Sequence, residues 1–315
     1  MILAIDLGGT SAKAAILTDE GNLIGRAQVK TSAKEGAEGT VRSLASLVKT
    51  SAERANVSLD EIEGIGVGAP GIIDSATGTV VSWTTFGWQN FPLSKELENF
   101  CRKKVFVLND ANAAALGESV FGAGKRYRDS ILVTLGTGIG GGIVLNGEIF
   151  EGYKSAGAEI GHTVIRYGGR RCSCGRRGCF ETYASTRALL REMKVACRKY
   201  PDSLLNRLMQ SQGEDAATLF AALDEGDTAA KEVFSRYIAM LGEGLLNLVN
   251  LFRPQAILIG GGISAQGEKL VAPLREYVTD RMLMPAYAPL KILAAKLFND
   301  AGLYGAAEYA RRQLK

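Results

Sequence analysis

The sequence predicts an α/β protein whose two domains are related by duplication. Its 315 residues exceed the roughly 100–200 residues of a typical domain. A strand that runs into a glycine turn occurs twice, at DLGGT (6–10) and at TLGTG (134–138). Each copy is followed by an apolar strand and a hairpin signal, so we expect two similar domains with a cleft between them.

The first part of the chain alternates strands and helices. Residues 1–32 alternate apolar runs with turns, which predicts three antiparallel strands. Apolar positions at helical spacing predict a helix over 38–57, and a buried strand then ends at Pro70-Gly71. A further helix is expected over 93–102.

The repeat begins after another strand and helix. VFVLND (105–110) predicts a strand, and the alanine-rich residues 111–122 predict a helix. Residues 130–150 repeat the opening pattern, and Asn146-Gly147 is a strong hairpin signal.

The remainder is mainly helical. Residues 183–252 include a long apolar helix at 233–252, and AILIGGGIS (256–264) predicts a strand that enters a glycine turn. The tail, 299–315, predicts a helix that returns to the first domain. We therefore expect a small domain of residues 1–118 plus 299–315 and a large domain of residues 119–298.

Composition excludes several classes of protein. Hydrophobic residues make up 46% and charged residues 22%, which excludes a disordered chain. No apolar run reaches the roughly 18–20 residues of a membrane helix, and the N-terminus lacks the pattern of a signal peptide. We expect a cytoplasmic protein with no membrane partner.

Glycine-rich turns follow three of the expected strands. The chain has 38 glycines but only 7 prolines, which indicates tight turns and close backbone approaches. Turns at 7–9, 135–142 and 259–264 expose backbone N–H groups that can cradle phosphate, with hydroxyls from Thr10 and Thr137. The alternative is ordinary tight turns in a β-rich protein.

Two common nucleotide motifs do not fit. Gly136, Gly138 and Gly141 match G-x-G-x-x-G, but a strand is expected after them where a dinucleotide motif requires a helix. No P-loop sequence is present. Asp6, at the end of the first strand, suits Mg²⁺ bound through water; the alternative is an Asx-turn.

Three of the five cysteines lie within eight residues of one another and predict a metal site. Cys172, Cys174 and Cys179 form C-x-C-x₄-C, and His162, the one histidine of the chain, precedes them. One imidazole and three thiolates complete a closed tetrahedral zinc site. With His162 bound to zinc, no histidine remains as a general base, which excludes serine–histidine and cysteine–histidine hydrolases.

The cysteines are surrounded by arginines. Arg170, Arg171, Arg176 and Arg177 resemble a nucleic-acid patch, but a solvated loop or pairs with carboxylates are the more common outcome. The net charge of +4 is too small to imply nucleic acid by itself. We expect no nucleic-acid partner.

Three carboxylates are candidates for chemistry. Asp110 lies where a strand meets a helix, so the helix dipole should keep it ionised near neutral pH. It can accept a proton from an attacking hydroxyl, or serve as an N-cap, and these two roles are compatible. Glu159 and Glu181 flank the zinc ligands and suit the hydroxyls of a sugar; the alternative is surface glutamates neutralised by the arginines.

These motifs together resemble the ROK family of bacterial sugar kinases and related repressors. The resemblance covers nearly the whole chain and implies an actin-like, ribonuclease-H-like α/β fold with two domains, an active-site cleft between them and a zinc-stabilised loop. The segments that carry it are DLGGT at 6–10, GAPG at 68–71, NDANAAALGE at 109–118, LGTGIGGG at 135–142, GAEIGH at 157–162, CSCGRRGCFE at 172–181, IGGGIS at 259–264 and NDAGLYGAA at 299–307.

The resemblance implies an ATP-dependent hexose kinase with Mg²⁺ and a structural Zn²⁺. Asp110 matches the catalytic base that activates the sugar 6-hydroxyl. The implied sugar-binding residues are Gly71, Asn109, Asp110, Glu159, His162 and Glu181. The implied ATP-binding residues are Gly8, Gly9, Thr10, Lys13, Gly136, Thr137, Gly138, Gly261 and Gly262.

One departure from the family pattern leaves the sugar open. Thr85 replaces an asparagine that glucokinases of this family often carry before the Pro-Leu pair. Glucose is the leading candidate, with N-acetylmannosamine, N-acetylglucosamine and fructose as alternatives, and polyphosphate stays open as a donor.

Two other functions would each require a feature that the sequence does not predict. A sugar-sensing repressor of the family would carry a helix-turn-helix before DLGGT, and that turn begins at residue 6 here. A nicotinamide dehydrogenase would need a helix after Gly141. The resemblance further suggests a homodimer or homotetramer.

Overall fold

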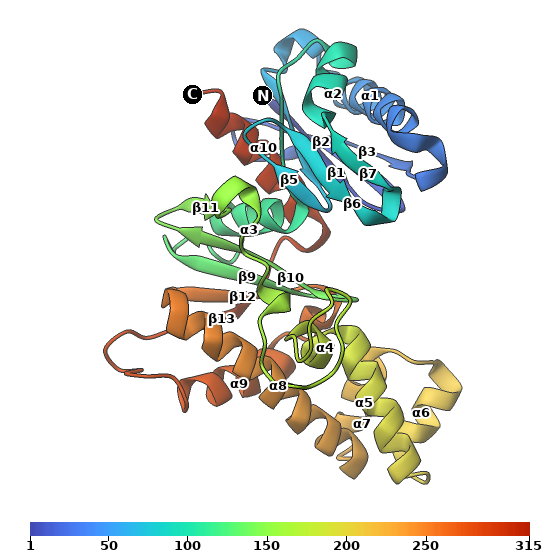
Figure 1. Ribbon diagram of the computed structural model, residues 1–315, viewed down its shortest axis with the longest axis vertical. Coiled ribbons are helices and arrows are strands. Elements are labelled where there is room, and N and C mark those ends of the chain that lie inside the picture. The colour runs from blue at the N-terminus through green and yellow to red at the C-terminus, as the bar shows by residue number, and fades with distance from the viewer. The chain divides into compact units, whose positions relative to one another are not determined.

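The computed structural model describes the whole chain, Met1–Lys315, and two compact units can be distinguished in it (Figure 1). The first unit comprises Met1–Ser130, Gly142–Ala158 and Lys296–Lys315. The second comprises Ile131–Gly141 and Glu159–Ala295. The predicted division into a small domain of residues 1–118 plus 299–315 and a large domain of residues 119–298 stays a prediction.

A five-stranded sheet with the order β3-β2-β1-β4-β8 forms the centre of the first unit. The first three strands pair antiparallel, as predicted for residues 1–32, whereas β1, β4 and β8 run parallel. The strands are β1 (Ile2–Leu7), β2 (Ser11–Leu17), β3 (Leu23–Lys30), β4 (Gly64–Ala69) and β8 (Val105–Asn109).

Alternation along β1 divides the hydrophobic core into two layers. Leu3 and Ile5 are buried in the layer that includes helix α1 (Gly36–Ala55), which packs on β2 and β3. Ile2 and Ala4 point the other way, into the layer with α3 (Asp110–Val120) and α10 (Ala301–Gln313). The period of two in a strand therefore places helices on both faces of the sheet.

A small antiparallel sheet completes the first unit and was not predicted. Its strands are β5 (Ile72–Asp74), β6 (Thr79–Trp83) and β7 (Trp88–Phe91). The ring of Trp83 stacks on that of Phe86 at 3.7 Å, and Trp88 packs edge-on against both. The helix predicted over 93–102 is α2 (Leu93–Cys101).

The second sheet repeats the pattern of the first. Its order is β11-β10-β9-β12-β13, which corresponds strand for strand to β3-β2-β1-β4-β8. Asn146 and Gly147 have φ of 56° and 82° in the turn between β10 and β11, as the hairpin signal predicts. The strands are β9 (Ser130–Leu135), β10 (Ile139–Leu145), β11 (Glu148–Phe150), β12 (Ala256–Gly260) and β13 (Lys291–Ala294).

Helices dominate the second unit, in agreement with the prediction for residues 183–252. No helix of the structure combines the length and the apolar composition that a membrane span requires. The long apolar helix begins earlier than predicted, at Thr228, because Asp227 caps it by accepting the N–H of Ala230. The helices are α4 (Glu181–Ala184), α5 (Thr186–Lys199), α6 (Leu204–Gln212), α7 (Ala216–Asp224), α8 (Thr228–Phe252) and α9 (Glu268–Thr279).

Glycine permits an unusually close contact between α3 and α10. A Cβ at Gly305 would lie 1.6 Å from the carbonyl oxygen of Ala113, and one at Gly117 would lie 2.2 Å from that of Ala301. Moving either carbonyl oxygen aside would distort the backbone of its helix. We therefore expect Gly305→Ala to destabilise the protein by about 1–3 kcal/mol, even though alanine favours a helix by about 1 kcal/mol.

The melting temperatures of Gly305→Ala and of a control variant, Gly262→Ala, test this expected loss of stability. Nothing lies within 4 Å of a Cβ at Gly262, so this control should melt close to the wild type. A Gly305→Ala protein that melts at or above the wild-type temperature would contradict the close contact.

Candidate active site and metal centre

The carboxyl edge of the first sheet brings together the acidic residues that the sequence singled out. Asp6 lies at the end of β1 and pairs in register with Gly68 of β4. Asn109 ends β8, next to Ala69 in register, and Asp110 begins α3. This edge, where parallel strands end, is the usual place of ligand sites in α/β sheets.

Both polar atoms of the Asn109 side chain, Oδ1 and Nδ2, form hydrogen bonds at this edge. Its Oδ1 accepts the N–H groups of Ala111 (2.9 Å) and Asn112 (3.2 Å), so Asn109 is the N-cap of α3. The prediction that Asp110 serves as the N-cap was wrong: Asn109 has the extended backbone that a cap requires, whereas Asp110 is already helical. The Nδ2 of Asn109 donates to the carbonyl of Gly71 at 3.1 Å.

Asp110 is a half-buried carboxylate with no cationic partner. Desolvation of its carboxyl group raises the pKa of Asp110 to about 6; the N–H of Ala111, at 2.8 Å from Oδ1, opposes this shift, and the nearby Asp6 carboxylate adds to it. The helix dipole, from which an ionised Asp110 was predicted, favours the charged form. Desolvation opposes the dipole here and outweighs it, although a pKa near 6 still leaves Asp110 mainly ionised at pH 7.

Asp6 and Asp300 make this edge strongly acidic. Burial raises the pKa of Asp6, Lys13 opposite it in the β-ladder lowers it, and Asp300 raises it. Asp300 forms an ion pair with Arg26, with N–O distances of 2.5 and 2.9 Å. The sequence analysis did not assign Asp300 a role, although Asn-Asp-Ala at 299–301 repeats the Asn-Asp-Ala of 109–111. Carboxylate oxygens near one another suit a hard cation such as Mg²⁺.

The predicted phosphate loops form tight turns between strands. In the first unit, Gly8 N–H donates to the carbonyl of Ser11, and the Thr31 hydroxyl donates to the carbonyl of Gly8. In the second unit, Gly136 N–H donates to the carbonyl of Gly138 at 3.0 Å. The other predicted members lie in or beside these turns: Gly9, Thr10 and Lys13 near Gly8, Thr137 between the two glycines, and Gly261 and Gly262 directly after β12.

The predicted strand β10 follows the turn at 136–138. A dinucleotide motif needs a helix at this position, so the match of Gly136, Gly138 and Gly141 to that motif is accidental.

The two glutamates beside the cysteines differ in their surroundings. Glu181 begins α4, and its Oε2 accepts the N–H of Ile139 at 3.4 Å, so Glu181 lies against the turn that carries Gly138. Glu159 is exposed, in the segment before the short helix that carries His162. Neither glutamate forms an ion pair with an arginine, so the arginines do not neutralise them.

The four predicted zinc ligands converge. One ligand atom from each of His162, Cys172, Cys174 and Cys179 lies within 4.8 Å of the others. The Sγ atoms of Cys174 and Cys179 are 3.7 Å apart, and Cys172 Sγ lies 3.5 Å from His162 Nδ1. Ligands about 2.3 Å (sulfur) and 2.0–2.1 Å (nitrogen) from a tetrahedral ion would be separated by about 3.8 and 3.6 Å, so the cluster fits zinc.

Thr85 lies on a short turn between β6 and β7. Both Thr84 and Thr85 are exposed, while Phe86, the next residue, is buried against Trp83. The Thr85 hydroxyl is therefore accessible to a ligand.

Comparisons with known proteins agree with this fold and these motifs. The family model described as "ROK family" matches residues 2–313. The glucokinase of Thermotoga maritima is 36% identical over 99% of this chain and 98% of its own length. A ROK glucokinase from Streptomyces griseus, solved with glucose and AMPPNP, superposes with a TM-score of 0.82 at 35% identity and covers 99% of both chains. The xylose repressor of Caldicellulosiruptor bescii is 33% identical over 96% of this chain and 76% of its own length.

The fold and these relatives define a phosphotransferase with the two-part α/β architecture of the actin-like sugar kinases. The chain belongs to the ROK family.

The metal centre gives the first prediction about this site. Cys174→Ser removes an exposed ligand, so we expect the bound zinc, about one per chain in the wild type, to fall well below that ratio and the melting temperature to drop. Cys101→Ser, outside the cluster, should keep its zinc. Elemental analysis after gel filtration measures both variants, and equal zinc in the two would contradict the site.

Asp110 gives the second prediction. A carboxylate whose pKa is raised by desolvation costs folding free energy whenever it is ionised, so Asp110→Asn should stabilise the protein at pH 7 by about 1–2 kcal/mol. The gain should shrink as pH falls through about 6 and vanish below the ordinary pKa of 3.8, where both states are protonated. Urea unfolding at pH 7.5 and pH 4.5 measures the difference, and a less stable Asn variant at pH 7.5 would contradict it.

Proposed function

We propose that this protein is an ATP-dependent hexose kinase that transfers the γ-phosphate to the 6-hydroxyl of a hexose, with glucose as the leading substrate. The observation that carries the proposal is Asp110: a half-buried, ionisable carboxylate with a raised pKa and without a cationic partner, at the carboxyl edge of the sheet. Because the chain belongs to the ROK family, we infer that this carboxylate takes part in phosphoryl transfer to a sugar.

Asp110 acts as the general base in this proposal. It accepts the proton of the sugar hydroxyl while the hydroxyl oxygen attacks the γ-phosphorus and the bond to the leaving diphosphate breaks. A pKa of about 6 makes Asp110 a stronger base than an exposed aspartate, yet keeps it mainly deprotonated at pH 7. Asn109 positions it by fixing the start of α3.

In this proposal the sugar ligands are Asn109 and Gly71, which belong to the first unit, and Glu159, His162 and Glu181, which belong to the second. Carboxylates accept hydrogen bonds from sugar hydroxyls. His162 can serve the metal and the sugar together, because Nδ1 faces Cys172 and leaves Nε2 for a hydroxyl. Zinc, when bound, orders this loop and takes no part in the transfer.

The glycine turns hold ATP in this proposal. Backbone N–H groups of Gly9, Thr10, Thr137 and Gly138 bind phosphate oxygens, and Lys13 adds a positive charge. Gly8 and Gly136 shape the two turns, because their own N–H groups donate to the carbonyls of Ser11 and Gly138. Asp6 holds Mg²⁺ through water, and Gly261 and Gly262 lie on the adenosine side.

The choice of sugar rests on the relatives and on one residue. The similarity of this chain to the glucokinases of Thermotoga maritima and Streptomyces griseus supports glucose as its substrate. The hydroxyl of Thr85 replaces a longer amide, so sugars with a substituent at C2, such as N-acetylmannosamine and N-acetylglucosamine, belong in every test, as does fructose. Polyphosphate belongs there as a donor.

Sugar-dependent ADP release tests the proposal. We expect turnover with Mg·ATP and glucose that exceeds turnover with mannose, fructose, N-acetylglucosamine and N-acetylmannosamine. Asp110→Asn should lower kcat by about 10²–10⁴-fold while the protein stays folded and zinc-loaded. Folded, zinc-loaded wild type that phosphorylates none of these sugars would overturn the kinase, and a gel shift would then test a role in DNA binding.

The pH profile of kcat/KM tests the base. The deprotonated carboxylate is the active form, so activity should be level above about pH 7 and fall about tenfold per pH unit below pH 6. A profile that stays level down to pH 4.5 would exclude Asp110 as the base.

A further inference from the structure

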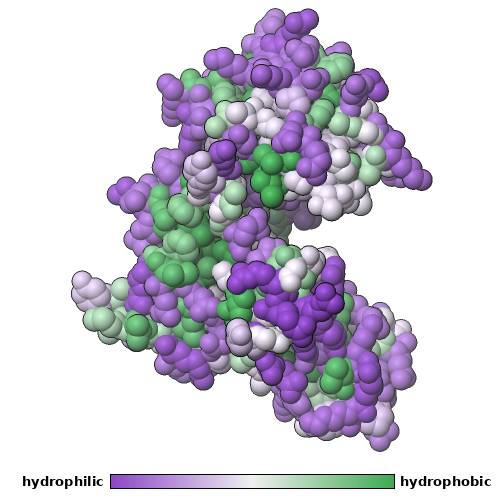
Figure 2. Space-filling view, viewed as in Figure 1, coloured by the Kyte–Doolittle hydropathy of each residue, from purple (hydrophilic) through white to green (hydrophobic).

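Glu118, in the last turn of α3, is a buried carboxylate that the proposed mechanism does not use. Charged side chains of this protein lie mainly at the surface, and hydrophilic residues cover most of the face drawn in Figure 2. Only two charged residues of the chain are buried: Glu118, which is 0% exposed, and Glu308, which is 5% exposed. A buried carboxylate must be compensated by cations or by hydrogen bonds.

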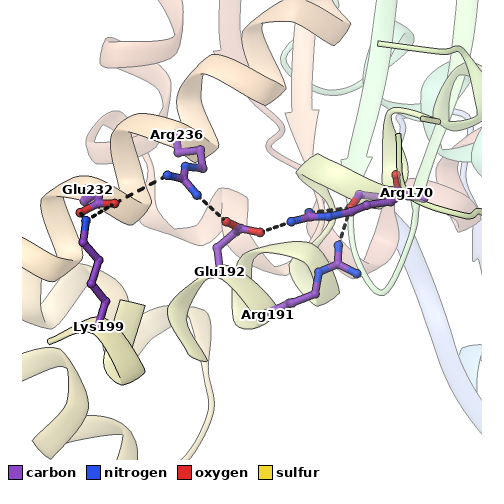
Figure 3. A network of polar contacts seen from close by, with 7 residues as sticks. Arg170, Arg191, Glu192, Lys199, Glu232 and Arg236 are labelled. Atoms are coloured by element: carbon purple, nitrogen blue, oxygen red, sulfur yellow. Dashed lines mark hydrogen bonds and ion pairs between the residues drawn. The ribbon is translucent and has the colours of Figure 1, made fainter. Parts of the chain in front are cut away.

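Glu118 differs from the other enclosed carboxylates in having no ion pair. Figure 3 shows the more common arrangement, in which Glu192 pairs with both Arg170 and Arg236. Glu308 is likewise paired with two arginines of its own helix, α10. Three backbone N–H groups compensate Glu118 instead.

These N–H groups come from two segments that lie far apart in the sequence but within the first unit. The Oε1 atom of Glu118 accepts the N–H groups of Lys296 at 2.8 Å and of Leu297 at 2.6 Å. Its Oε2 atom accepts the N–H of Ala123, in the turn after α3, at 2.9 Å. A Cβ at Gly122 would lie 2.0 Å from Oε2, so glycine at this position makes room for the carboxylate. The carboxylate therefore anchors the later segment to α3.

The anchored segment leads directly into the start of α10. The N–H of Asp300 donates to the carbonyl of Leu297 at 2.9 Å, and Ala301 begins the helix. Between them, Phe298 has a φ of 47°, a left-handed conformation that is unfavourable for a residue with a side chain. Its side chain is 66% exposed, so packing does not hold this conformation. The bonds from Glu118 to the two preceding N–H groups fix the chain where it enters this turn.

The start of α10 in turn lies against the acidic edge of the sheet. A Cβ at Gly302 would lie 3.1 Å from the carboxyl carbon of Asp6, so the first turn of α10 is in contact with that side chain. The charge of Asp300 also repels that of Asp6. A shift of residues 296–297 would therefore move the neighbours of Asp6, while Asp110 would keep its place on α3.

We propose that Glu118 is a positioning residue for Mg·ATP, because it sets where Asp300 and the first turn of α10 lie against Asp6. This inference rests on the proposed function, in which Asp6 holds Mg²⁺ through water. Glu118 is fully enclosed and touches no substrate, so it acts only through the segment that it anchors. Mg²⁺ demands nearly ideal octahedral geometry, which makes its binding sensitive to a small displacement of the groups around it.

Hydrogen exchange tests the anchor without any ligand. Glu118→Gln keeps the size of the side chain, but the amide has one acceptor oxygen and no charge, so the bonds weaken whichever way it turns. We expect the amides of Lys296 and Leu297 to exchange at least about tenfold faster than in the wild type. The amides of Ala111 and Asn112, at the start of α3, should exchange as before. Unchanged exchange at residues 296–297 would overturn the anchor.

Nucleotide binding tests the positioning. In calorimetry with Mg²⁺ and AMPPNP, a non-hydrolysable ATP analogue, Glu118→Gln should bind roughly tenfold more weakly than the wild type. The KM for Mg·ATP should rise by a similar factor, while the KM for glucose should change by less than about twofold. A merely structural role would not distinguish the two substrates. Faster amide exchange with wild-type affinity for Mg·AMPPNP would overturn the proposal.

Glu308→Gln is the matched control. It makes the same substitution in the other buried carboxylate, removes ion pairs with two arginines and should lower the melting temperature. Because Glu308 lies in the second half of α10, away from Asp6, this variant should bind Mg·AMPPNP like the wild type. Equally weak binding in both variants would indicate a general loss of stability and overturn the positioning role.

A second variant and the choice of ligand keep the outcomes separate. Gly122→Ala places a methyl group against Oε2 of Glu118, so it should reproduce the effects of Glu118→Gln should that variant fail to fold. Binding of Mg·AMPPNP requires neither sugar nor turnover. Wild-type protein that binds the analogue but phosphorylates no sugar would therefore contradict the kinase and leave the comparison of variants intact. Wild-type protein that does not bind Mg·AMPPNP would overturn both.

Discussion

The contact between the backbones of α3 and α10 positions the acidic edge of the first unit. Packed helices usually keep their axes about 8–10 Å apart, because side chains separate them. Here Gly117 and Gly305 supply no side chain, and Gly66 of β4 similarly leaves room for the carbonyl of Ala306. The two helices therefore cross in backbone contact, with Ala113–Gly117 of α3 against Ala301–Gly305 of α10. Asp110 starts one of them and Asp300 precedes the other.

The partners of the three aspartates distinguish their roles. Asp300 is neutralised by Arg26, and Asp6 lies opposite Lys13 in the β-ladder. Asp110 has no cation beside it: hydrogen bonds from backbone N–H groups and from the Asn109 side chain favour its ionised form, and burial and the repulsion of Asp6 oppose it. A carboxylate that lacks a cation keeps a raised pKa and remains available to a proton, whereas an ion-paired one becomes a poor base. The absence of a cation beside Asp110 also lowers the stability of the folded protein. Such a trade-off between activity and stability is common at functional charges.

Local patterns in the sequence predicted most of the fold and the metal cluster, and features that depend on distant partners were missed. Three cysteines within eight residues need only a tight loop to converge. The sheet of β5, β6 and β7 was missed because Trp83, Phe86 and Trp88 do not alternate with polar residues and are buried by one another. Asparagine and aspartate both cap helices well, so only the backbone angles distinguish Asn109 from Asp110 as the cap. The partner of Arg170 is 22 residues away, which no spacing rule predicts.

One of the zinc ligands, Cys172, is in contact with Glu181, which we propose to bind the sugar. Cys172 Sγ lies 3.5 Å from both His162 Nδ1 and Glu181 Oε1, so one thiolate joins the metal cluster to the proposed sugar carboxylate. Arg171 is the residue before that cysteine, and both residues line the pocket that Glu181 also lines. A bound metal adds order to so short a loop, so zinc fixes Glu181 close to His162 and Cys172. Partial loss of zinc should therefore disturb sugar binding through Glu181, whereas loss of Arg171 alone leaves the cluster intact.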